Sequence, residues 1–168
     1  MDLIIGEGGP TDKDSIHIET SKRRRIKNVR MQQRPEEAMI AARKIHEKPR
    51  RFVRSLVSTY NCVGMVFANR RTFIDTSEIP AILEDDEYYP VKDEAKVAVG
   101  DIVIYSKSDS PGITHIGIVV VNQMEIGRRD LRVLSQFGRD GEYIHDLLDV
   151  PEGYGTVVKF YSERRGVR

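Results

Sequence analysis

The sequence of 168 residues contains one cysteine, no tryptophan and no long apolar run. A single cysteine excludes an internal disulfide and any structural zinc site built from cysteines. The histidines, at positions 17, 46, 115 and 145, lack the spacing of metal ligands, so we expect neither a metal site nor a cofactor. No stretch approaches the roughly 20 apolar residues that cross a bilayer, and we expect no membrane insertion.

The sequence also lacks the features of a secretory signal at its start. The stretch MDLIIGEGGPTDKD has three consecutive apolar residues and no basic region before them. A secretory signal combines a basic region with a longer apolar run. Together with the single cysteine, this predicts a protein of a reducing compartment, the cytoplasm. The length suits one domain with a core of ordinary size.

Charge is distributed unevenly along the chain. Residues 1–54 carry 14 Lys/Arg and 8 Asp/Glu, whereas the remainder carries 13 and 18. The most basic stretch, SKRRRIKNVR at residues 21–30, has six basic residues and no acid. Such a block is typical of a solvated arm, and its functional interpretation is contact with an anionic partner. We therefore interpret residues 1–33 as a basic, poorly ordered leader and residues 34–168 as the folded domain.

Helical patterns come first along the folded part. The segment RPEEAMIAARKIHEK predicts a helix, because Pro35 suits the first helical position and the next two glutamates complement the helix dipole. Apolar residues at helical spacing predict a second helix over 50–60. Asn61 is a good N-cap, so a third helix is expected to begin directly after it. This places Cys62 at the first helical position.

Strand patterns fill the second half of the chain. Residues 75–94 carry eight acids and one lysine, and we expect an irregular surface connection there. Alternating and β-branched runs predict strands at 99–105, 112–121, 131–137 and 155–161, with a hairpin-type turn at Asp140-Gly141. Helices followed by an antiparallel sheet predict an α+β fold.

Cys62 is either a small apolar core residue or a nucleophile. A thiol has a reference pKa of about 8.5, and only the thiolate is strongly nucleophilic. A helix start contributes about 0.3–1 kcal/mol to an anion, so activation needs a cationic partner, usually histidine. The free amides of the helix start can also bind an oxyanion. Tyr60 either lines the same cleft or packs at the helix end.

His115, in the segment GITHIGIVVV, is the candidate partner. Alternation along this strand places Ile113, His115, Gly117 and Val119 on one face. If the helix that begins at Cys62 packs on that face, His115 meets the helix start, and Gly117 lets the helix come near. The alternative is a histidine that is satisfied within the structure.

Three segments in this order, YNCVGMVFANR, VGDIVIY and ITHIGIVV, resemble the papain-like NlpC and CHAP hydrolases. Those proteins place a nucleophilic cysteine at a helix start, then a strand led by Gly-Asp, then a strand with histidine and a glycine two residues later. The resemblance covers about residues 50–137. It implies N-terminal helices packed on an antiparallel β-sheet.

The resemblance makes Cys62 the nucleophile and His115 the general base and acid. In that family a third polar group, from the next strand, orients the imidazole. We favour Gln136, whose side-chain carbonyl can accept from the imidazole as an asparagine does in papain-like sites. Ser135, on the opposite face of the same strand, and His145 are the alternatives, since many relatives use a second histidine.

The implied function is hydrolysis of a peptide or amide by acyl transfer through the cysteine. Asn61 and Val63 stand where cell-wall members often have aspartate and serine, so peptidoglycan specificity is not supported. Transfer to an acceptor other than water, as in acyltransferases and deamidases, stays open. So does a different class, a non-catalytic binding module on the same fold that uses residues 21–30.

Overall fold

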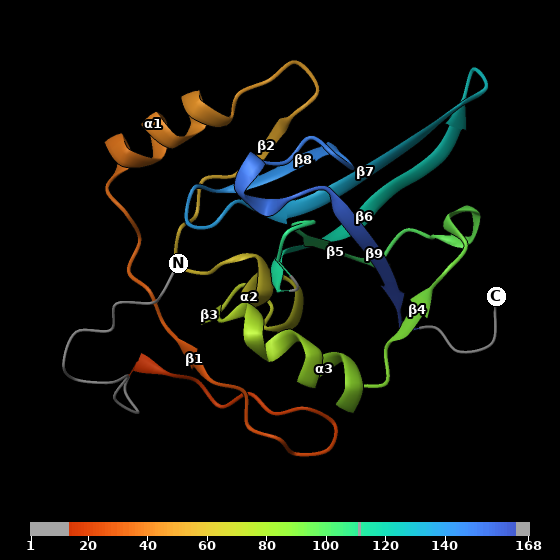
Figure 1. The fold of residues 1–168 in the computed structure, drawn as a ribbon. Helices are drawn as coiled ribbons and strands as arrows, with labels where there is room; N and C mark the ends of the chain where they lie inside the picture. Colours follow the sequence, from red (N-terminus) through yellow and green to blue (C-terminus); the bar gives the residue numbers. More distant parts are fainter. Residues whose placement is uncertain (1–13, 111, 164–168) are drawn as a thin grey trace.

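The computed structural model describes residues 14–110 and 112–163 (Figure 1). Seven strands form one antiparallel sheet in the order β2-β8-β7-β6-β5-β9-β4, and β1 pairs with β3 in a small second sheet. The strands are β1 (Asn28–Val29), β2 (Phe52–Ser55), β3 (Phe73–Ile74), β4 (Tyr89–Val91), β5 (Ile102–Ser106), β6 (Ile113–Glu125), β7 (Arg128–Gln136), β8 (Glu142–Asp146) and β9 (Val157–Ser162).

The α-helices of the described residues are α1 (Glu36–His46), α2 (Cys62–Phe67) and α3 (Ile79–Asp85). Short 3-10 turns add η2 (Thr76–Glu78), η3 (Glu94–Lys96) and η4 (Glu152–Tyr154). Figure 1 shows α2 and α3 next to each other by the large sheet, with α1 apart from them. The combination of helices with an antiparallel sheet confirms the predicted α+β class.

Each face of the large sheet has its own core. One core joins α2 and α3 to β5 and β6; its buried members are Ile26, Cys62, Val63, Ala68, Ile74, Ile79, Ile82, Leu83, Ile102, Ile104 and Ile116. The core on the other face consists of Val97, Val103, Tyr105, Val119, Val133 and Phe160. Helix α1 also belongs to this second side, because the ring of His46 packs against Phe137 and Tyr143, with centroids 5.2 and 5.4 Å apart.

Most predicted elements lie where the patterns put them. Helix α1 occupies the segment that follows Pro35, and α2 begins at Cys62. Strands β5, β6, β7 and β9 match the four predicted strands. The turn before β8 is also confirmed, because the Phe137 carbonyl accepts from the Asp140 N–H and the Phe137 N–H donates to Gly141.

The helix predicted over 50–60 is wrong, because this segment contains β2. Strand β2 pairs antiparallel with β8, with Phe52 opposite Ile144 and Val53 opposite Tyr143. Exposed and half-buried residues alternate along it, as a half-buried edge strand requires. A short segment with few apolar residues fits both the helical and the strand period. The presence of a partner strand therefore decides which of the two structures forms.

The connection predicted as irregular, residues 75–94, contains η2, α3 and β4. Ile79, Ile82 and Leu83 are buried along one side of α3, and Pro80 lies in its first turn. Proline is well tolerated there because the first amides of a helix need no intrahelical partner. The acidic residues obscured this apolar stripe in the sequence.

Residues 14–33 belong to the folded unit rather than to a poorly ordered leader, and residues 1–13 lie outside the described residues. Ile26 is 1% exposed and packs in the same core as Cys62. The side chain of Asn28 accepts from the N–H of Ile16 at 3.0 Å and donates to its carbonyl at 2.9 Å. The hydroxyl of Thr72 also donates to Asn28. The density of basic residues in this segment did not reveal that Ile26 and Asn28 hold it to the core.

Candidate active site

Asn61 fixes the start of α2 and seats the helix on β3. Its side-chain oxygen accepts from the N–H groups of Gly64, at 3.0 Å, and Ile74, at 3.1 Å. Its amide donates to the Ile74 carbonyl at 2.7 Å. A Cβ at Gly64 would lie 1.7 Å from the Thr72 carbonyl oxygen, so only glycine permits this approach. The predicted N-cap is confirmed, and it holds Cys62 in place.

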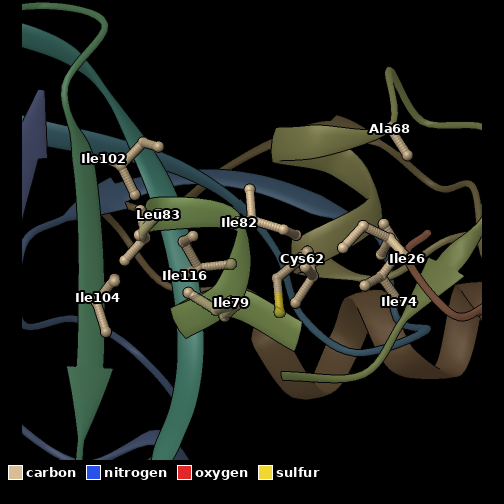
Figure 2. Close-up of a cluster of buried hydrophobic side chains, with 11 residues drawn as sticks. Ile26, Cys62, Ala68, Ile74, Ile79, Ile82, Leu83, Ile102, Ile104 and Ile116 are labelled. Atoms are coloured by element: carbon tan, nitrogen blue, oxygen red, sulfur yellow. The ribbon is translucent and has the colours of Figure 1, made fainter. Parts of the chain in front are cut away.

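Cys62 lies within the core that α2 and α3 place against β5 and β6 (Figure 2), and it is 5% exposed. Burial raises the pKa of its thiol to about 11. Backbone N–H groups act in the opposite direction, that of Ile116 most strongly and that of Val63 next. In this conformation the thiol is neutral, and its sulfur lies at the main chain of β6.

His115 is completely buried on the other face of β6, opposite Tyr105 of β5. Among the described residues, neither of its ring nitrogens has a hydrogen-bond partner. Its ring lies flat on Tyr154, with centroids 3.9 Å apart and an interplanar angle of 5°. Burial, and then the nearby His145, hold the pKa of His115 well below its ordinary value. The imidazole is therefore neutral.

Helix α2 packs on the Ile116 side of β6 and does not share a face with His115, so the condition that would bring the imidazole to the helix start is not met. A Cβ at Gly117 would lie 2.5 Å from a methyl of Val133 and 3.1 Å from the Cβ of Ser135. Gly117 therefore accommodates β7 rather than the helix. Both faces of β6 are apolar, and alternation alone does not say which face receives a helix.

Tyr154 links the two candidate residues. Its ring stacks on His115, and its phenol interacts electrostatically with Cys62. The Cys62 sulfur is near the N–H of Ile116, the residue after His115 in β6, but the side chains of Cys62 and His115 lie on opposite faces of the strand. No hydrogen bond joins the thiol to the imidazole. The sequence analysis missed Tyr154, since no spacing connects it to His115.

Ser135 and His145, the two alternatives for the third residue, form a buried pair on the face of His115. The Ser135 hydroxyl lies 2.8 Å from Nε2 of His145, whose Nδ1 lies 2.8 Å from the Asp146 carbonyl. A carbonyl only accepts, so Nδ1 carries the proton and Nε2 accepts from the hydroxyl. Burial lowers the pKa of His145 to about 4. The Ser135 oxygen keeps acceptor capacity for a further donor.

Gln136 and Tyr60 lie on the opposite side of the sheet from His115. The Gln136 amide donates to the Val57 carbonyl at 2.8 Å. The Tyr60 hydroxyl donates to the buried carboxylate of Glu142 at 2.7 Å, and Arg70 donates to the same oxygen at 2.6 Å. The structure therefore does not bring Gln136 to the imidazole, and Tyr60 is a core residue bound to Glu142.

Residues 14–110 and 112–163 hold no group of three or more His, Cys, Asp or Glu side chains that could bind a metal ion. In the same residues, no helix combines the length and apolar character needed to span a bilayer.

A search against protein-family models, a search of curated proteins and a search of solved structures gave no match to this chain. A functional assignment therefore depends on the geometry around Cys62 and His115.

Proposed function

We propose that the protein is a cysteine-dependent hydrolase, a peptidase or amidase with a papain-like arrangement, in which Cys62 is the nucleophile and His115 the general base and acid. The observation that carries this proposal is the buried imidazole of His115, whose two nitrogens lack partners among the described residues. Leaving a buried polar group unpaired costs about 1–3 kcal/mol. Such groups in native structures need an explanation, and a catalytic role is one. A catalytic imidazole that pairs with a thiol only during the reaction would explain why His115 is left unpaired in spite of this cost in free energy.

The chemistry requires one proton relay and two acyl-transfer steps. His115 takes the proton of the Cys62 thiol, and the thiolate attacks the carbonyl carbon of an amide. The tetrahedral oxyanion collapses to a thioester while His115 returns the proton to the leaving amine. Water, deprotonated by His115, then attacks the thioester, which releases the acid and restores the thiol. Backbone N–H groups near the sulfur, such as that of Ile116, can donate to the oxyanion.

Ser135 supports the proposal better than Gln136 as the group that orients the imidazole. It shares the face of His115, and its proton is engaged by His145. Its oxygen can therefore accept from the imidazole N–H, which leaves the other ring nitrogen free to act as base. We assign Ser135 and His145 as positioning residues, because they act through His115.

The test uses p-nitrophenyl acetate as the acyl donor and intact mass with peptide mapping as the readout. A hydroxylamine-sensitive acetyl group that fragmentation of the peptide assigns to Cys62, the only cysteine, identifies the thioester. We expect acetylation of Cys62 in the wild-type protein and none in Cys62→Ala. His115→Gln should slow acetylation by about 100-fold or more. No thioester, or an equal rate in His115→Gln, would contradict the proposal.

A binding module is the second candidate, favoured by the surface position of the basic segment. The exposed basic residues of this segment are Lys22, Arg23, Arg24, Arg25, Lys27 and Arg30. Arg24 pairs with Asp85, with Nε and Oδ2 2.8 Å apart, and Lys22 lies 3.8 Å from the same carboxylate. Salt-dependent binding of single-stranded RNA that survives Cys62→Ala and is lost with Arg23→Glu and Arg25→Glu would favour this function.

A further inference from the structure

The turn η4 covers the catalytic face of His115 with a single side chain. The ring of Tyr154 lies parallel to the imidazole at a centroid distance of 3.9 Å. Its main-chain carbonyl accepts from the hydroxyl of Thr114. The stack leaves no space for another group on that side of the imidazole.

Tyr154 also occupies the place that a reacting carbonyl needs. A substrate must contact the Cys62 sulfur while its leaving group is within hydrogen-bond reach of a His115 nitrogen. The ring of Tyr154 covers one side of the His115 imidazole, and its phenol interacts electrostatically with Cys62. The substrate and the ring of Tyr154 therefore compete for one space.

The turn that carries Tyr154 is held by few contacts. None of the residues of η4 is fully buried, and Glu152 and Gly153 are exposed. Pro151 precedes the turn, and Gly155 follows it with a φ of 77°. A Cβ at Gly155 would lie 2.2 Å from the Ser106 carbonyl oxygen, so this end of the turn is fixed against β5. A short segment with fixed ends and little burial opens at a small cost in free energy.

We infer that η4 is an autoinhibitory plug, in which Tyr154 closes the Cys62–His115 site and its displacement opens the site. Its regulatory meaning rests on the proposed hydrolase function, whereas the closure itself concerns only access to the two side chains. Opening would uncover the imidazole of His115 and admit a substrate to it.

The first test measures the rate at which iodoacetamide alkylates Cys62 at pH 8 in three proteins, the wild type, Tyr154→Ala and Tyr154→Phe. Their folding is checked by circular dichroism and thermal melting. We expect Tyr154→Ala to react roughly tenfold or more faster than the wild type, since the stack and the phenol are lost. Tyr154→Phe is the matched control, because it keeps the stack, and it should react within about threefold of the wild type. An equal rate in Tyr154→Ala and the wild type would overturn the plug.

Thr114→Val provides a second variant if Tyr154→Ala fails to fold. It removes the hydroxyl that donates to the Tyr154 carbonyl and to the Tyr105 carbonyl, and it preserves the size of the side chain. We expect an alkylation rate between those of the wild type and an open site. A rate equal to that of the wild type would overturn the plug.

Acetylation by p-nitrophenyl acetate separates failure of the plug from failure of the hydrolase. Fast alkylation of Tyr154→Ala without any acetyl thioester would support the plug and refute the hydrolase. Equally fast acetylation of the wild type and Tyr154→Ala would refute the plug and support the hydrolase.

Discussion

The imidazole of His115 and the phenol ring of Tyr154 lie face to face, 3.9 Å apart and within 5° of parallel. This stack buries a histidine whose two nitrogens lack partners in the described part of the chain. Beside it, Cys62 is held as a neutral thiol at the main chain of the same strand. If the protein is the hydrolase proposed above, this conformation keeps its thiol and its imidazole from reacting.

Replacing the unpaired imidazole with an apolar ring should stabilise the fold. His115→Phe removes two buried nitrogens and preserves the aromatic stack on Tyr154. We expect the free energy of unfolding at pH 7, measured by urea titration, to rise by about 1 kcal/mol. His46→Phe is the control, because Nε2 of His46 lies 3.1 Å from the Asp140 carboxylate, and it should lose stability. A loss in His115→Phe as large as in the control would contradict an unpaired imidazole.

Acidification should destabilise the protein through its buried histidines. The folded state holds His115 and His145 neutral, with the pKa of His145 lowered to about 4, whereas the unfolded chain binds protons below about pH 6.5. A lowered folded-state pKa means that stability is complete above 6.5 and falls as the pH falls toward 4. Urea titrations between pH 7 and 4.5 should show this fall, with a smaller slope in His115→Phe. Equal slopes would show that His115 is not held neutral by the fold.

The stability of the fold should depend on the ion pair between the buried carboxylate of Glu142 and Arg70. Arg70→Ala removes a donor at 2.6 Å from a carboxylate that is 1% exposed, and we expect a loss of about 2 kcal/mol in unfolding free energy. Arg50→Ala removes a pair with Asp146 at the surface, and the loss should stay below about 1 kcal/mol. Thermal and urea unfolding of both variants checks this order. The reverse order would contradict the burial of Glu142.

Loss of the Asn61 side chain should lower the stability of the protein by more than loss of an exposed N-cap does. Asn61→Ala removes the cap on Gly64 and both bonds to the Ile74 backbone, so we expect a loss of about 2–4 kcal/mol in unfolding free energy. Asp93→Ala removes an exposed cap on Ala95 and should cost about 0.5–1 kcal/mol. Equal losses in the two variants would show that the bonds from Asn61 to β3 contribute nothing.

Local patterns predicted the elements that carry the site, because local chemistry decides them. Asn61 is a good cap in any context, and the β-branched residues of the apolar run around His115 favour a buried strand. Alternation likewise showed that only one of Ser135 and Gln136 faces His115. These features required no knowledge of distant residues.

Long-range packing decided the features that the sequence did not predict. Alternation left open which side of β7 faces His115, and the structure places Ser135 there. The segment around Phe52 fits both a helix and a strand until β8 is present as a partner. Tyr154 is distant in sequence from His115, and no short-range signal predicts that their rings stack.

The most direct test of the account is the pH dependence of Cys62 alkylation in the wild type, in Tyr154→Ala and in Tyr154→Ala combined with His115→Gln. The wild type should react slowly, with a midpoint near pH 11. In Tyr154→Ala the midpoint should fall below the ordinary thiol value of about 8.5, because the opened site lets His115 stabilise the thiolate. The double variant should lose this shift. A midpoint at or above about 8.5 in Tyr154→Ala, unchanged by the loss of His115, would contradict a catalytic Cys62–His115 pair.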